Sequence, residues 1–146
     1  MKANDTEIRI FLEGSKQFIV PLFQRTYSWR RKNIQRLWND IQETKTASDS
    51  PHFFGSFVTM PLDSSASKVS RYLIIDGQQR LVTTFIFLAA LRNRINELNP
   101  GYDKKDEINE SYLINKFHQE KESKYKVVPT QADKSIFFEI LSGDVK

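Results

Sequence analysis

The chain of 146 residues has no cysteine, so disulfides, thiolate metal sites and cysteine nucleophiles are all excluded. It has only two histidines. His52 is more simply interpreted as a loop residue, and His118 as a residue of a solvated helix end, than as metal ligands. Glycine is scarce, and no G-x-x-x-x-G-K-[ST] sequence occurs, so the chain is not a P-loop NTPase. No apolar run is long enough to cross a bilayer, and the first ten residues lack the apolar core of a signal peptide. These absences predict a cytoplasmic protein without a membrane partner.

What the sequence does contain is typical of one folded domain. Hydrophobic residues make up 39% and charged residues 27%, and eleven phenylalanines and two tryptophans can fill a core. The net charge of +4 weakly favours anionic partners such as nucleotides or nucleic acid. We expect a single domain over residues 1–146. Because the sequence stops directly after the last predicted helix, we also expect it to be a fragment of a longer chain.

Periodicity and turn residues predict an α+β fold, a small mixed sheet packed by helices. The helix over 78–98 is apolar nearly all round in its first half, so it should lie at the centre of the fold. The strands at 52–60 and 71–77 should form a hairpin across a Ser-rich loop. The other predicted elements are strands at 16–20 and 124–128, and helices at 7–12, 29–44 with Ser28 as N-cap, 105–117, and 130–141 with Thr130 as cap.

A polar pentapeptide, Asp76-Gly77-Gln78-Gln79-Arg80, lies between the strand that ends at Asp76 and this central helix. A strand–glycine–helix turn can present the first helical amides to an anion. Arg80 offers a fork suited to phosphate, the glutamine amides can donate, and Asp76 could hold water or a metal ion. The simpler alternative is that Asp76 caps the helix and Gln-Gln-Arg forms a solvated first turn. For the pentapeptide alone, that alternative is the commoner one.

A second polar segment, residues 19–34, repeats the Gln-Arg pair at Gln24 and Arg25. Phe23, Tyr27 and Trp29 surround the pair, and arginine with aromatic rings is a suitable lining for a base or a phosphate. The alternative is that the rings belong to the core and Arg25 pairs with a surface acid. One turn further on, Thr83 and Thr84 can donate hydroxyls. Two further groups are open to a similar choice: Asp133 can cap a helix or approach the site, and Arg30-Arg31-Lys32 can touch DNA or form a solvated helix face.

The combination of segments resembles a known family. In order, FIVPLFQRTYSW, LWNDI, FFGSFV, LIIDGQQRLVTTFIFLAAL and VVPTQADKSIFF resemble the N-terminal domain of GmrSD-type, modification-dependent (type IV) restriction systems. The resemblance covers nearly the whole chain. The family is similar to the ParB/sulfiredoxin superfamily, whose strand–G-x-x-R–helix turn binds nucleotide phosphates. The resemblance therefore implies a nucleotide-binding, NTP-hydrolysing regulatory domain of a phage-defence system, and the alternative is a ParB-like DNA-binding module.

The resemblance assigns roles to particular residues. The catalytic candidate is Asp76, and the nucleotide- or phosphate-binding candidates are Gln24, Arg25, Gly77, Gln78, Gln79, Arg80 and, more weakly, Thr84. The implied cofactor is an NTP, and whether Mg²⁺ accompanies it stays open. The implied partners are a nucleotide, DNA through the full-length protein, and a nuclease domain or subunit, and self-association stays open. The sequence lacks the His-and-Asn nuclease domain, so no DNA-cleaving site is assigned to it, and the absence of cysteine excludes sulfiredoxin chemistry.

Overall fold

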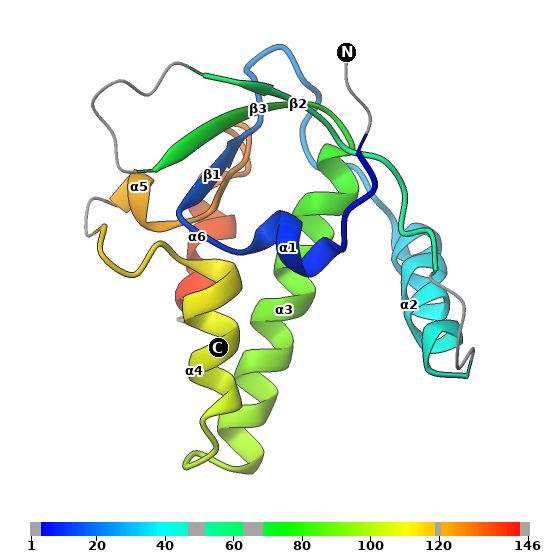
Figure 1. The fold of residues 1–146 in the computed structure, drawn as a ribbon, viewed down its shortest axis with the longest axis vertical. Helices are drawn as coiled ribbons and strands as arrows, with labels where there is room; N and C mark the ends of the chain where they lie inside the picture. The colour runs from blue at the N-terminus through cyan, green and yellow to red at the C-terminus, as the bar shows by residue number, and fades with distance from the viewer. Residues whose placement is uncertain (1–3, 47–51, 63–68, 119–120, 144–146) are drawn as a thin grey trace.

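The computed structural model describes residues 4–46, 52–62, 69–118 and 121–143, and Figure 1 shows a small sheet above a group of helices. The predicted α+β class is confirmed. In chain order the elements are α1 Ile8–Leu12, β1 Lys16–Ile19, α2 Arg31–Thr46, β2 Val58–Pro61, β3 Ser70–Asp76, α3 Gln78–Leu98, α4 Lys104–Ile108, the π-helix η1 Asn109–Leu113, α5 Lys121–Lys124, β4 Val127–Val128 and α6 Lys134–Ser142.

The sheet is mixed and has the strand order β2-β3-β1-β4. Strand β1 is parallel to both β3 and β4, whereas β2 and β3 form the predicted antiparallel pair. Phe18 of β1 stands beside Tyr72 and Val127 in the register, and Phe18, Val127 and Ile74 are buried. This face therefore belongs to the core.

Helix α3 occupies the centre of the fold, as its apolar sequence predicted. It starts one residue after β3, and its first half buries Leu81, Phe85 and Ala89 in the same core as the sheet. Figure 1 shows α4 alongside the second half of α3, with α6 behind them and α2 standing apart. Helix α2 reaches α3 through Trp38, whose ring centroid lies 5.8 Å from that of Phe87. No helix within the described ranges is both long and apolar enough to span a membrane.

Several element boundaries differ from the prediction. The strand expected over 52–60 begins only at Val58, because the preceding residues turn through Gly55 at φ 114°. The helix expected over 105–117 widens to a π-helix at Asn109 and ends at Leu113. Helix α2 begins at Arg31, so Ser28 is not its N-cap.

The C-terminal elements are shorter than expected. The strand expected over 124–128 is reduced to two residues. The last helix begins at Lys134 with Asp133 at the N-cap position, so Thr130 is not its cap.

Candidate functional site

The turn between β3 and α3 depends on Gly77. Its φ is 89°, and a Cβ built on it would lie 2.7 Å from Phe57 Cδ1 and 3.0 Å from the carbonyl oxygen of Ser56. Both the positive φ and this close approach require glycine. The turn is therefore packed directly against the segment that precedes β2.

The N-terminus of α3 has free backbone donors. Asp76 Oδ1 accepts the N–H of Gly77 at 2.8 Å and does not reach further into the helix. No side chain among the described residues caps α3, and its hydrogen-bond ladder begins with the N–H of Leu81 on the Gly77 carbonyl, at 3.0 Å. The N–H groups of residues 78–80 are thus available to a ligand, which is the usual basis of anion binding at a helix start.

The two glutamines of the turn hold the segment 24–28 against α3. Gln78 Nε2 donates to the carbonyl of Arg25 at 3.0 Å, and Gln79 Nε2 donates to that of Thr26 at 3.1 Å. The Gln79 amide oxygen accepts the N–H of Ser28 at 2.8 Å. Both glutamine side chains are buried. The pair is therefore not a solvated first turn, because it binds the backbone of a segment about fifty residues upstream.

Gln24 extends this contact to the end of β3, where its Nε2 donates to the Ile75 carbonyl at 3.1 Å. Tyr27 extends it along α3. Its hydroxyl lies 2.8 Å from Thr83 Oγ1, and it is the donor, because the Thr83 hydroxyl itself donates to the Gln79 carbonyl at 2.7 Å. Side chains of the segment 24–28 thus reach both β3 and α3.

A third part of the sequence approaches the same place. Asp133 Oδ2 accepts the N–H of Tyr27 and the hydroxyl of Thr130, both at 2.8 Å. Of the two roles open to Asp133, the structure favours the approach to the site over a side-chain cap of α6, which it does not make. The sequence signal was the order of the segments, because VVPTQADKSIFF formed part of the resemblance.

These groups surround a small hollow with space of about 10 Å³ for the centre of a water-sized molecule. That is room for about one water. Among the described residues the buried amide oxygen of Gln78 has no hydrogen-bond partner, so a bound water or ligand can donate to it. The lining residues are Val20, Arg25, Tyr27, Gln78, Gln79, Val82, Pro129, Thr130 and Asp133.

Arg80 does not line this hollow. Its Nη1 donates to the Ser56 carbonyl at 3.3 Å, and its guanidinium stands 5.9 Å from the centre of the Phe57 ring. Thr84 only donates to the Arg80 carbonyl within the helix, at 2.8 Å. The structure therefore brings Gln24, Arg25, Gln78 and Gln79 together, whereas Arg80 has different neighbours on the side of residues 55–57.

A metal ion would find few ligands here. Among the residues that the structure describes, no group of three or more His, Asp or Glu side chains could hold one. Asp76 is exposed and supplies a single carboxylate. One carboxylate fits a Mg²⁺ ion that is held mainly by water and by the phosphates of a ligand.

Comparison with known proteins gave one family. The model of the GmrSD restriction endonuclease N-terminal domain matches residues 8–146. A search of curated proteins found no match.

Proposed function

Because the chain belongs to the GmrSD restriction endonuclease N-terminal domain family, we propose that it is the nucleotide-binding, NTP-hydrolysing regulatory domain of such a restriction system. The observation that carries the proposal is the free N-terminus of α3 at Gly77. Its unpartnered N–H groups and the positive end of the helix dipole favour phosphate oxygens. Arg25 supplies a cation from the segment 24–28, and Arg80 supplies one from the first turn of α3, on the side of residues 55–57.

The residues around the turn then have distinct roles. The backbone N–H groups of 78–80 hold phosphate, and the two arginines neutralise its charge. Gln78 and Gln79 fix the position of Arg25 through the backbone of the segment 24–28. The unpartnered amide oxygen of Gln78 accepts a hydrogen bond from a ligand hydroxyl or amine.

Asp76 is the proposed catalytic residue. Its Oδ1 is engaged with the Gly77 N–H, which orients the carboxylate at the start of α3. In that position it can accept a proton from an attacking water or contact the Mg²⁺ that an NTP brings when it binds. Hydrolysis itself would join the water oxygen to the γ-phosphorus, break the bond from that phosphorus to the β,γ-bridging oxygen, and release the nucleoside diphosphate and inorganic phosphate.

Size limits the binding mode. The hollow has room for about one water, so a nucleotide must lie at its mouth unless the segment 24–28 moves. Phe23, which precedes this segment, has 79% of its surface exposed and presents a ring on which a base can stack. The phosphates are then expected at the α3 terminus and the base outside it.

Titration of each labelled NTP against the protein tests the proposal. Arg25→Gln and Arg80→Gln should each weaken binding about tenfold, because each removes a charge-assisted hydrogen bond. Arg94→Gln is the matched control, since Arg94 lies on α3 and is exposed in an ion pair with Glu97. Asp76→Asn should retain binding and lose hydrolysis. Equal affinity for all three arginine variants would contradict the site.

The second candidate function is DNA binding. Leu22 and Phe23 are 87% and 79% exposed, and Arg30, Arg31 and Lys32 are exposed just beyond them. Exposed apolar side chains together with basic ones are typical of proteins that bind duplex DNA. Arg31→Gln with Lys32→Gln should then weaken duplex binding and reduce its salt dependence, without changing the affinity for NTP. Unchanged duplex affinity would exclude this surface.

A further inference from the structure

A second hollow lies between the last half of α3, the α4–η1 segment and the end of α6. Its volume for water-sized molecules is about 360 Å³. It shares no lining residue with the hollow at the DGQQR turn. A concave space of this size is typical of small-molecule sites.

Arg92 forms part of its wall and has no carboxylate partner among the described residues. Its Nη1 donates to Asn109 Oδ1 and to the Leu141 carbonyl, both at 2.7 Å. Its Nε and Nη2 both donate to Asn93 Oδ1, at 3.1 and 2.9 Å. All of these acceptors are neutral, and within the described ranges Arg92 makes no ion pair. One N–H of Nη2 has no acceptor there either, because an Nη atom carries two and one is used.

Burial gives this arrangement a free-energy cost. It lowers the pKa of Arg92 from its ordinary value, because desolvation disfavours the charged form. Arginine keeps its proton all the same, so its positive charge remains in the wall without an ion-pair partner in the described part of the chain. An anion bound beside it would offset the cost of desolvation.

Two further cations line the hollow. Lys124 has an exposed side chain that lies 5.5 Å from the centre of the Tyr125 ring. Lys105 donates to the Pro100 carbonyl at 2.6 Å and lies 3.4 Å from Asp106 Oδ2. Among the described lining residues Asp106 is the only acid, so in that set three cations face one carboxylate and the formal charges sum to two positive.

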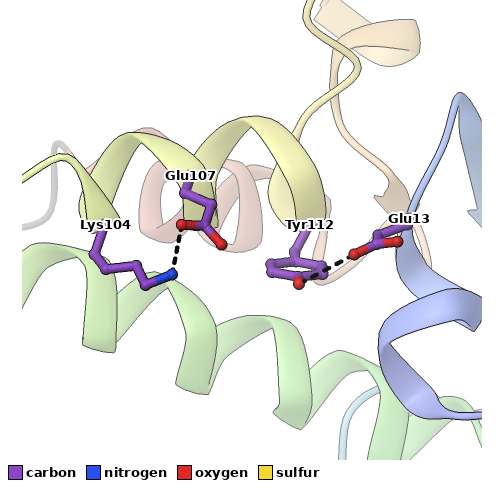
Figure 2. A network of polar contacts seen from close by, with 4 residues as sticks. All are labelled: Glu13, Lys104, Glu107 and Tyr112. Atoms are coloured by element: carbon purple, nitrogen blue, oxygen red, sulfur yellow. Dashed lines mark hydrogen bonds and ion pairs between the residues drawn. The ribbon is translucent and has the colours of Figure 1, made fainter.

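Other polar side chains of the same helical segment are paired differently. Figure 2 shows Lys104 joined to Glu107 and Tyr112 joined to Glu13, at 2.6 and 3.3 Å. Hydrogen bonding to Glu107 raises the pKa of Lys104, so its charge is matched within α4. The excess of cations is thus a property of the hollow and not of the whole segment.

The remaining lining groups suit a polar ligand. Asn93, Asn96 and Asn109 supply amides that can both donate and accept. Asn109 is also the first residue of the π-helix η1, and π-helical turns are frequent at functional sites. The end of α6 closes the hollow at Gly143, where a Cβ would lie only 3.4 Å from Arg92 Nη2.

We propose that this hollow binds the phosphate dianion of a small phosphorylated molecule, with Arg92 and Lys124 on the phosphate and the asparagine amides on the rest of the ligand. The doubly positive lining matches a dianion. The free N–H of Arg92 points to an oxygen acceptor, and the volume admits a sugar or base beyond the phosphate. The site is separate from the proposed nucleotide site, so it does not depend on hydrolysis there.

The test is a titration followed by amide chemical shifts, with inorganic phosphate, adenosine monophosphate and adenosine as three probes at up to about 10 mM. The phosphate probes should shift the side-chain amides of Asn93, Asn96 and Asn109, and adenosine should not. Tighter binding of the monophosphate than of phosphate identifies a phosphorylated metabolite as the ligand. The opposite order identifies free phosphate, and in that case the part of the proposal that concerns the rest of the ligand is wrong.

Variants complete the test. Arg92→Gln should weaken binding about tenfold and Lys124→Gln about threefold. Arg94→Gln, two residues along α3, and Arg25→Gln, at the other hollow, should leave it unchanged. Because Arg92 also joins η1 to α6, Lys124→Gln gives a result even if Arg92→Gln does not fold. Failure of phosphate to bind the wild type, or equal affinity in Lys124→Gln and Arg94→Gln, would overturn the proposal.

Discussion

The substitution Gly77→Ala tests how the DGQQR turn is built. Gly77 has φ 89°, and the added Cβ would lie 2.7 Å from Phe57 Cδ1 and 3.0 Å from the Ser56 carbonyl oxygen. Two costs therefore add. A Cβ in the left-handed region costs about 1–2 kcal/mol, and overpacking against a backbone atom that cannot rotate away costs about 1–3 kcal/mol.

The second cost can be isolated because the chain contains two matched glycines. Gly14 and Gly143 have φ 86° and 84°, and a Cβ on them would meet atoms no closer than 3.9 and 3.4 Å. Urea denaturation should give Gly14→Ala and Gly143→Ala losses of about 1–2 kcal/mol, and Gly77→Ala a loss of about 2–5 kcal/mol. If Gly77→Ala costs no more than the controls, the segment 55–57 does not pack against the turn, and the reasoning about the site is wrong.

Three other substitutions probe the account. Gln79→Ala should lower the free energy of unfolding by about 1–3 kcal/mol, because two backbone groups lose their partner, whereas Gln35→Ala on the exposed face of α2 should change it by less than about 0.5 kcal/mol. Tyr27→Phe should cost about 0.5–1.5 kcal/mol in the same denaturation experiment, because it removes the bond to Thr83, and no loss would contradict that bond. Burial lowers the pKa of Lys126 to about 8, and its Nζ donates to two carbonyls. The unfolded chain therefore binds more protons above pH 8, so stability relative to Lys126→Met should rise between pH 8 and the ordinary lysine pKa of about 10.4. A constant difference would show that Lys126 is not desolvated.

Elements with a strong local pattern were predictable from the sequence. The helix over 78–98 matched α3 because its apolar stripe is long and Gly77 marks its start. The boundaries of the strand expected over 52–60 were not predictable, because an apolar, β-prone run does not reveal that Gly55 turns the chain towards Arg80. The expected helix over 105–117 changes to a π-helix at Asn109, whose side chain accepts a hydrogen bond from Arg92 of α3. Tertiary contacts of this kind can override local propensity.

The candidate site was also predictable only in part. The sequence placed two polar segments near each other, since the Gln-Arg pairs repeat and follow strands. It did not reveal that glutamine side chains bind backbone carbonyls, because such bonds depend on three-dimensional position and not on residue type. For the same reason the sequence did not decide whether Asp133 caps a helix or approaches the site, where it contacts Tyr27.

The central claim is that a phosphate binds to the free amides at the start of α3. The most direct test follows the backbone N–H resonances of the protein while each of the four NTPs is added. The largest shifts should occur at Gln78, Gln79 and Arg80, and Arg25→Gln should reduce them at equal nucleotide concentration. Nucleotide-dependent shifts elsewhere in the chain, with these three amides unchanged, would contradict it.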